Sequence, residues 1–405
     1  MPLLPPPDEW SRRAAELQVR LAGSGMAGCL ITQNVGIYYY TGSMQTGYVF
    51  VPSTGEPTYY VRRSFARALE EARMRTVELR SLRGFGDQLK EDYPDAFAPG
   101  PDGAASVVGA DLDVMPAQLY LKLGEAIPAA RLHDASALLR HARSVKSEYE
   151  IGRIAHAAEA VAAALDEGLA ALKPGMTELE LMSVIENGIR GRGHIGLMRM
   201  RGYNQEIMTG IVAAGEAAAE PSYFDGPAGG RGLSAASPKG VSRRPIGRDE
   251  PILIDIGCCI DGYVIDQTRT AVIGKLRPEL GAAYRVSESI LRAAEKVLRP
   301  GETPERAYLL ALDMAKEAGL ADHFMGYGKD QVKFLGHGIG LEIDEWPVLA
   351  KGFREPFVPG MTIAVEPKFT FPGLGVVGIE NTYLIAEDGC RPLTSSPEGL
   401  YELRR

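Results

Sequence analysis

The sequence predicts two domains: an α/β domain at the N-terminus, followed by a larger α+β domain with a pseudo-twofold duplication. Three observations support this prediction. Helix-like and strand-like patterns alternate in the first third of the chain, a long capped helix begins near residue 147, and a helix–Pro-Gly–helix pattern occurs twice in the second part. The 405 residues suffice for two or three domains with a sizeable core. We place the domains at residues 1–143 and 144–405.

Hydrophobic periodicity and turn residues assign the elements of the N-terminal domain. We expect helices at residues 12–23 and 64–75, strands at 26–32, 37–40 and 105–110, and a hairpin made of strands 47–52 and 58–61. The Pro- and Gly-rich stretch FAPGPDGAAS is expected to form a loop. This alternation of helices and strands is typical of an α/β domain.

Helix caps mark the start of the second domain and its duplication. Ser147, followed three positions later by Glu150, gives a capping-box pattern. A helix that ends in Lys-Pro-Gly or Arg-Pro-Gly precedes a Thr N-cap at Thr177 and again at Thr303. Because strand-rich sequence follows each helix pair, we expect two related halves with a sheet between them.

Five polar residues of the second domain stand in apolar or β-prone surroundings. They are Asp255 in PILIDIG, Asp266 in GYVIDQTRT, His337 in FLGHGIGLEIDEWP, Glu366 in MTIAVEPKF and Glu380 in VVGIENTYLI. Each alone is more often a solvated, ion-paired or satisfied core residue, but an unpaired buried carboxylate is very costly. The whole set therefore predicts a cage for two divalent metal ions. Oxygen ligands with one nitrogen and no thiolate favour Mn, Fe, Co or Zn.

The chain resembles the pita-bread metallopeptidase family, which includes aminopeptidase P, prolidase, methionine aminopeptidase and creatinase. The stretches ILIDIGCCIDGYVIDQTRT, GHGIGLEI, PGMTIAVEP and GLGVVGIENT carry the family's ordered ligand series, and LAGSGMAGCLITQNVGIYYYTGS is similar to the creatinase-type N-terminal domain. The resemblance covers nearly the whole chain and implies a creatinase-like N-terminal domain, a pita-bread catalytic domain and a homodimer.

The resemblance also implies a role for each ligand. Asp266 and Glu380 are expected to bridge two ions, Asp255 to complete one ion, and His337 with Glu366 to complete the other. A metal-bound hydroxide would then attack a carbonyl carbon, with Glu366 passing the proton.

The residues expected around the substrate depart from the family's peptidases. Asp344 stands where prolidases and aminopeptidases P carry a second histidine, and Ser222 stands at the histidine of a Pro-His pair. Gly378 replaces an arginine, and Asn381 replaces an acid. We therefore expect a hydrolase that resembles Xaa-Pro aminopeptidase or dipeptidase but has a changed substrate shell. Asp344 is a catalytic candidate as a proton carrier or cation binder, and a turn-capping role is the alternative.

Further residues are candidates to bind a small peptide or small-molecule substrate, although core packing is the commoner fate of aromatic side chains. They are Ser222, Tyr223, Phe224, Arg199, Arg201, Tyr203, Trp346 and His194. Two other functions remain open on the sequence. One is a hydrolase or lyase of a small zwitterion, similar to ectoine hydrolase or dimethylsulfoniopropionate lyase. The other is a peptide-binding module without turnover.

Composition argues against nucleic acid and membranes as partners and favours a location in the cytoplasm. The net charge of −8 offers no basic stripe for nucleic acid, and no apolar run is long enough to predict a membrane span. Four cysteines without a CxxC pair favour the reducing cytoplasm, and the proline-rich start MPLLPPPDEW does not resemble a signal peptide.

Overall fold

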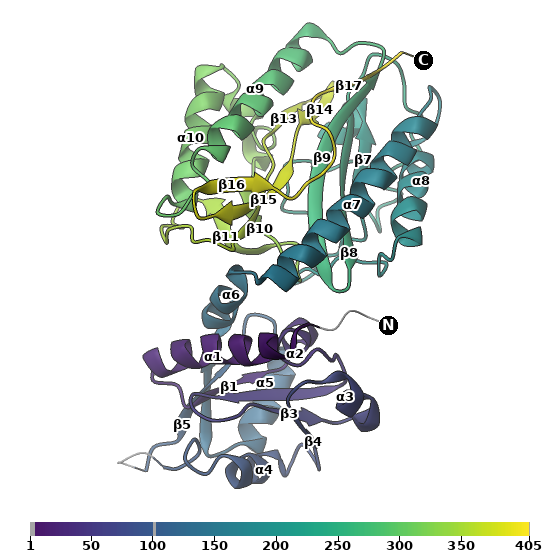
Figure 1. Cartoon of the computed structure of the whole chain (residues 1–405). Helices are drawn as coiled ribbons and strands as arrows, with labels where there is room; N and C mark the ends of the chain where they lie inside the picture. Colours follow the sequence, from purple (N-terminus) through teal and green to yellow (C-terminus); the bar gives the residue numbers. More distant parts are fainter. Residues whose placement is uncertain (1–4, 100–102, 405) are drawn as a thin grey trace. The chain divides into compact units, whose positions relative to one another are not determined.

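The fold was analysed in a computed structural model that describes residues 5–99 and 103–404. The chain forms two compact units, Met1–Arg143 and Ser144–Arg405 (Figure 1). Residues 100–102 of the stretch expected to be a loop lie outside the described residues.

The first unit is built on a six-stranded mixed sheet with strand order β4-β3-β2-β1-β5-β6. Its strands are β1 (Gly28–Ile31), β2 (Gly47–Pro52), β3 (Thr58–Val61), β4 (Arg75–Glu78), β5 (Ser106–Ala110) and β6 (Ala130–Asp134). Its helices are α1 (Pro7–Gly23), α2 (Asn34–Thr41), α3 (Phe65–Glu71), α4 (Phe85–Asp92), α5 (Ala117–Ala126) and α6 (Ser136–Ser144), which ends at the unit boundary. The predicted hairpin is confirmed, because β2 pairs with β3 in antiparallel register.

One predicted strand of this unit is wrong. Residues 37–40 belong to helix α2, which buries Ile37, Tyr39 and Tyr40. A short apolar run does not distinguish a strand from a buried helix by periodicity. The missed signal is Gly42, whose φ of 77° closes the helix with a left-handed cap and whose N–H donates to Tyr38 O. The helix predicted at 64–75 is also shorter than expected, because Arg75 already begins β4.

The second unit combines two helix pairs with two larger sheets and a β-ribbon. Its helices are α7 (Glu148–Ala171), α8 (Glu178–Gly191), α9 (Pro278–Glu295) and α10 (Pro304–Glu317). One sheet has the order β17-β9-β8-β7, formed by β7 (Gly210–Ala214), β8 (Ile252–Ile260), β9 (Tyr263–Ile273) and β17 (Tyr401–Leu403). The other has the order β11-β10-β12-β15-β16, formed by β10 (Phe334–Gly338), β11 (Glu345–Ala350), β12 (Thr362–Val365), β15 (Asn381–Ala386) and β16 (Gly389–Pro392). The ribbon pairs β13 (Lys368–Phe371) with β14 (Gly375–Gly378).

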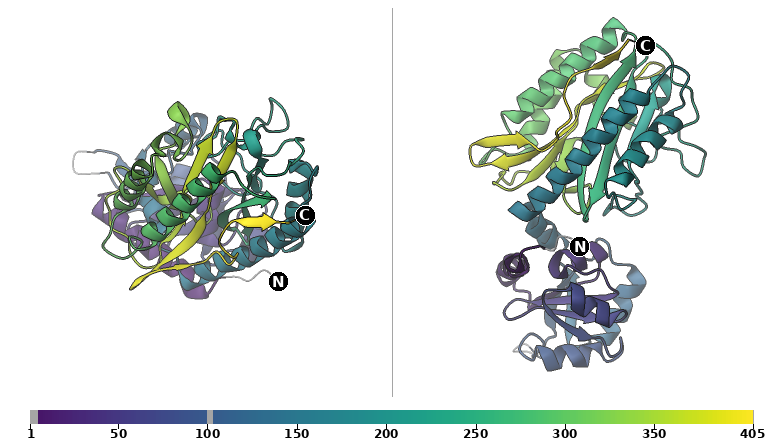
Figure 2. Two further views of the ribbon diagram at one scale, coloured as in Figure 1. Left: turned by 90° about the horizontal axis from the view of Figure 1, so that it is seen from above. Right: turned by 45° about the vertical axis from the view of Figure 1, so that its right-hand side comes forward.

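The predicted duplication of helix pairs is present. Ser147 and Glu150 form a complete capping box at α7, and Thr177 does the same with Glu180 at α8. Thr303 caps α10 by accepting from the Arg306 N–H. The two helix pairs lie on the outside of the strands (Figures 1 and 2). The fold class predicted from the sequence is therefore confirmed.

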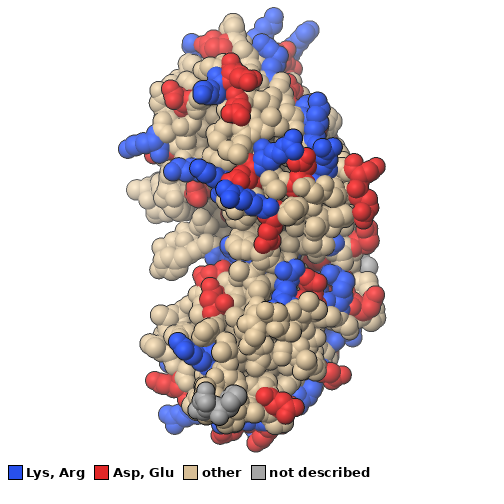
Figure 3. All heavy atoms as spheres, turned by 90° about the vertical axis from the view of Figure 1, so that its left-hand side faces the viewer, with Lys and Arg blue, Asp and Glu red and all other residues tan. Residues whose placement is uncertain are grey.

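Two further features are the character of the helices and the distribution of charge on the surface. None of the helices in the described part of the chain combines the length and apolar character that crossing a bilayer requires. On the face drawn in Figure 3, acidic and basic side chains are interspersed.

Candidate metal centre

The two predicted aspartate ligands lie on one face of the β8–β9 hairpin. Asp255 is opposite Thr268 and Asp266 is opposite Gly257 in the antiparallel register. Because side chains alternate along a strand, Asp255 and Asp266 are diagonal neighbours on the same face. The hairpin thus brings two carboxylates together without a long loop.

The other three predicted ligands come from the second sheet of this unit. His337 lies on β10, where it pairs with Ala364 of β12, and Glu366 directly follows β12. Glu380 precedes β15 and forms an isolated bridge with Thr268 of β9. This bridge joins the two sheets at the point where the five side chains meet.

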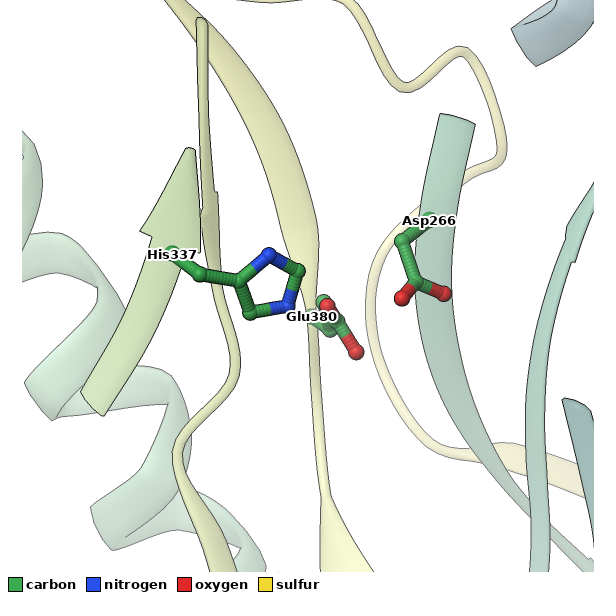
Figure 4. Close-up of side chains that lie close together, drawn as sticks. All are labelled: Asp266, His337 and Glu380. Atoms are coloured by element: carbon green, nitrogen blue, oxygen red, sulfur yellow. The ribbon is translucent and has the colours of Figure 1, made fainter. Parts of the chain in front are cut away.

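Asp266, His337 and Glu380 form one possible cation site, since one ligand atom from each lies within 4.8 Å of the others. In Figure 4 the imidazole points toward the two carboxylates. His337 Nδ1 lies 3.0 Å from Gly338 O and must carry the proton of that hydrogen bond, so that Nε2, 3.7 Å from Glu366 Oε1, is the nitrogen that could bind a metal. Glu380 Oε1 is buried without a hydrogen-bond partner among the described residues. This donor set fits a divalent cation, which would satisfy the orphaned oxygen.

Crowding changes the proton affinities of these ligands. Burial, followed by the charges of Glu380 and Asp255, raises the pKa of Asp266 well above its ordinary value. Burial and the charge of Glu380 also raise the pKa of Glu366 to about 7, against the opposing effect of Lys368. Burial would lower the pKa of His337, but Asp344 and Glu366 raise it. A bound cation would favour the deprotonated carboxylates that metal binding requires.

Asp255, Glu366 and Glu380 form a second possible cation site. Lys368, which sequence reasoning missed, lies among these three carboxylates. Its Nζ is 2.6 Å from Glu366 Oε2, 3.0 Å from Glu380 Oε2 and 3.2 Å from Asp255 Oδ2. The signal that points to it is its position two residues after Glu366, on the first residue of β13. Its ammonium group holds the pKa of Glu380 below the ordinary value although burial alone would raise it.

Buried contacts hold the ligand-bearing segments in place. Arg269 donates to Glu380 O at 2.7 Å and to Asn381 Oδ1 at 2.9 Å. Asn381 is therefore part of this structural clamp. Lys146 Nζ lies 2.9 Å from Glu345 Oε2, and Glu345 accepts from the Leu341 N–H. The second clamp fixes the turn between His337 and β11.

A small cavity of about 50 Å³ opens beside the ligands. It is lined by Asp255, Asp266, His337, Glu366, Asp344, Lys239, Phe224 and neighbouring residues. Asp344 Oδ1 lies 3.6 Å from His337 Nδ1, and its side chain is 45% exposed. Lys239, a second lysine that sequence reasoning missed, lies with Nζ 2.7 Å from the centre of the Phe224 ring. This Nζ is buried without a hydrogen-bond partner among the described residues, and burial lowers the pKa of Lys239 to about 7.

Most residues predicted to bind substrate lie elsewhere. Tyr203 is 91% exposed and Tyr223 is 59% exposed. Arg201 Nη1 lies 3.6 Å from Glu342 Oε2, and Trp346 packs edge-on against Phe353. The remaining placements are as follows: His194 Nδ1 accepts from the Cys259 N–H, Ser222 lines a separate cavity, and Arg199 O accepts from the Ile343 N–H.

Phe224 and Asp344 are the two residues of the expected substrate shell that the structure brings to the ligand cavity. The substrate roles of the others stay predictions. Lys239 was missed because it lies in the Gly- and Ser-rich stretch GGRGLSAASPKG, whose path the sequence pattern does not fix.

Comparison with known families identifies the two parts of the chain. The family model of metallopeptidase family M24 matches residues 152–387, and that of the creatinase/prolidase N-terminal domain matches residues 13–145. The chain belongs to metallopeptidase family M24. It is thus a metallohydrolase, as the sequence predicts, and membership of this family implies divalent metal binding.

Individual relatives of this M24 member match over almost their whole length. A probable dipeptidase PepE from Mycobacterium tuberculosis is 30% identical over 96% of both chains. An Xaa-Pro dipeptidase from Pyrococcus furiosus is 26% identical over 91% of this chain and 94% of its own. The crystal structure of dipeptidase PepE from Mycobacterium ulcerans superimposes with a TM-score of 0.81 at 26% identity, covering 100% of both chains. These relatives favour a peptidase over a hydrolase or lyase of a small zwitterion and over a peptide-binding module without turnover.

Proposed function

We propose that this M24 protein is a divalent-metal-dependent dipeptidase whose substrates include Xaa-Pro dipeptides. The substrate class is taken from the names of the relatives, which are dipeptidases and Xaa-Pro dipeptidases. The observation that carries the proposal is the convergence of Asp266, His337 and Glu380, because it leaves a buried carboxylate oxygen and an imidazole nitrogen facing one point.

The ligand types suit Mn, Co, Zn or Fe. When bound, such an ion activates water and polarises a carbonyl oxygen. The protein's own groups would do the rest. Glu366 lines the cavity beside the ligands, and its carboxylate is the group that would accept a proton and pass it on. Gly338 O accepts from His337 Nδ1 and orients the imidazole, and the Asp344 carboxylate 3.6 Å from Nδ1 would support it by its charge.

Lys239 is our candidate for the group that binds the substrate's carboxylate. It is the lysine that lines the cavity while making no hydrogen bond within the described residues. Its ammonium lies over the ring of Phe224, and the side chain lines the cavity beside the ligands. A free C-terminal carboxylate is the feature that separates a dipeptide from an internal peptide bond, and an ammonium group recognises it by charge.

The cavity is small for a dipeptide, since about 50 Å³ holds only a few water molecules. The segment with Phe224, Pro227 and Ala228 also lines the neighbouring cavity of about 160 Å³. A shift of this segment would join the two spaces, and we expect it to accompany substrate binding.

Three further properties are retained as proposals. The two compact units support domains at residues 1–143 and 144–405. The four free cysteines support the cytoplasm. A homodimer rests on the family resemblance alone. The second of the two expected metal ions would have to share Asp255, Glu366 and Glu380 with the ammonium of Lys368.

Hydrolysis of a panel of dipeptides tests the proposed function. The protein should cleave Xaa-Pro dipeptides after loading with Mn²⁺, lose this activity in a chelator, and regain it when Mn²⁺ is restored. N-acetylated and C-amidated versions of the same dipeptide are the matched substrates, and we expect amidation to reduce cleavage because Lys239 then has no carboxylate to bind. Metal-independent cleavage, or no cleavage of any dipeptide by the loaded protein, would overturn the proposal.

A further inference from the structure

Lys368 occupies the middle of the second carboxylate group. An ammonium group has three N–H donors, and the Nζ of Lys368 lies within 3.2 Å of oxygens from Glu366, Glu380 and Asp255. These three carboxylates are also the set whose oxygens lie close enough together to hold a metal ion. The lysine therefore makes the contacts that a cation at this place would make.

The stem of Lys368 is fixed by its surroundings. The side chain is fully buried and its backbone pairs with Gly378 across the β13–β14 ribbon. A Cβ at position 378 would lie 2.6 Å from Lys368 Cγ and 2.7 Å from Pro367 O. The arginine that the family's peptidases are expected to carry at this position therefore has no room beside Lys368. Withdrawing the ammonium from its three partners would leave a buried charge unpaired, which is strongly unfavourable.

The ammonium and a metal ion exclude each other at this position. A divalent ion bound to these oxygens would lie about 2.0–2.2 Å from each of them, and so in the space that Nζ fills. Two cations held so close together would also repel each other strongly in a buried site. The second group therefore does not fit the second metal ion that the family resemblance implies.

Glu380 divides its two oxygens between the two sites. Oε2 accepts from Lys368 Nζ at 3.0 Å and from Thr268 Oγ1 at 2.7 Å. Oε1 has no hydrogen-bond partner among the described residues, and Glu380 is also a member of the group with Asp266 and His337. The carboxylate is thus arranged to bridge the lysine on one side and a metal ion on the other.

We propose that the ammonium of Lys368 replaces one metal ion, so that the centre binds a single divalent cation between Asp266, His337 and Glu380. Asp255 then serves as a partner of Lys368 and not as a metal ligand. The inference rests on the proposed function, because it presumes that the first group binds a metal. It changes the expected ratio of ions to chains from two to one.

The test is the metal content of the full-length protein after equilibration with excess Mn²⁺ and removal of unbound ion. We expect one Mn²⁺ per wild-type chain, with the electron paramagnetic resonance signal of an isolated ion. Lys368→Gly should bind two ions and show the signal of a magnetically coupled pair. Lys368→Ala is the second variant if the glycine variant does not fold, and Lys351→Gly, at an exposed position, is the matched control that should keep one ion.

Each other outcome has a definite meaning. Two coupled ions in the wild-type protein would overturn the inference while leaving the proposed function intact. A single ion in both wild type and the Lys368 variants would show that the lysine does not exclude the second ion, and would also overturn it. No bound ion in any of the proteins would overturn both the inference and the proposed function.

Discussion

The two possible cation sites of the second unit share Glu380, but different groups lie beside its two oxygens. On one side, the protein supplies its own cation, because Lys368 Nζ lies within hydrogen-bonding distance of three carboxylates. On the other side, Asp266 and Glu380 face the imidazole of His337, whose Nε2 could bind a metal. The first arrangement is complete within the chain, whereas the second requires an added ion.

The proton affinities of Glu380 and Asp266 show the effect of contact with Lys368. The pKa of Glu380, which contacts Lys368, is lowered despite burial. The pKa of Asp266 is raised well above its ordinary value, because burial and the charges of Glu380 and Asp255 outweigh the opposing charge of Lys368. The ammonium thus favours the ionised form of Glu380, but it only partly offsets burial at its other two partners, because the pKa of Asp255 is raised and that of Glu366 is raised to about 7. Asp266, which has no ammonium in contact with it, depends on a bound ion for its charge. The difference between the two sites leads to four predictions.

Substitution of the two aspartates should have unequal effects. Asp266→Asn should lose the bound ion and reduce kcat/KM by on the order of 10³ or more, because metal activation of water is lost. Asp255→Asn should keep the ion, because Asp255 is a partner of Lys368. Metal analysis and dipeptide hydrolysis measure both effects. Loss of the ion in both variants would show that Asp255 is a metal ligand.

Lys368→Met should destabilise the metal-free protein. Removing the ammonium leaves three buried carboxylates without their partner, and breaking a buried ion pair in this way costs about 3–5 kcal/mol. Urea unfolding with and without Mn²⁺ measures the change, and we expect Mn²⁺ to restore much of the lost stability by binding only the folded state. Lys351→Met, at an exposed site, should be nearly neutral. A metal-free Lys368→Met protein as stable as wild type would contradict the role of the ammonium.

Asp344→Asn should weaken metal binding at the site formed by Asp266, His337 and Glu380, and should leave the contacts of Lys368 unchanged. Its carboxylate lies 3.6 Å from His337 Nδ1, and loss of such a supporting group typically costs about 10- to 100-fold in activity or metal affinity. Asp344→Glu is the control that keeps the charge. Calorimetric titration with Mn²⁺ together with kcat/KM measures the effect. Unchanged values in Asp344→Asn would reduce Asp344 to a turn-capping acid.

Substrate binding should depend on pH, because Lys239 loses its charge as the pH rises. Burial lowers the pKa of Lys239 to about 7, so the ammonium form is present below this pH and is lost as the pH rises through it. KM for a dipeptide should therefore rise about 10-fold between pH 6 and 8, because the charged fraction falls by about that factor. An ion bound to Asp266 would offset the carboxylate charge that supports the ammonium, and would move the midpoint lower. Lys239→Arg, which stays charged, should flatten this change in KM, and an identical profile in this variant would exclude Lys239 as the carboxylate-binding group.

The architecture of the second unit could be predicted because the sequence signals for it are local. The caps at Ser147, Thr177 and Thr303 are set by a few neighbouring residues, and the structure contains all three. The strand at residues 37–40 was wrong because a short apolar run fits a buried helix equally well, and only Gly42 marks the difference.

The predicted ligands meet in one place because each lies on or beside a strand of the two sheets, which fix their spacing. The substrate shell was harder to predict. Tyr203 and Tyr223 were chosen by residue type, and the structure leaves both exposed. Lys239 reaches the cavity from an irregular segment, which has no periodicity to read. Lys368 was overlooked although it follows Glu366 by two residues, because a lysine near strand-like sequence is usually assumed to extend into solvent.

A crystal structure of the Mn²⁺-loaded wild-type protein, with anomalous scattering recorded to locate the ions, would show whether Lys368 takes the place of a metal ion. We expect one anomalous peak per chain, within coordination distance of Asp266, His337 and Glu380, and Lys368 Nζ still in contact with Asp255 and Glu366. A second peak between Asp255 and Glu380, with the lysine displaced from its carboxylates, would contradict the replacement of a metal ion by Lys368.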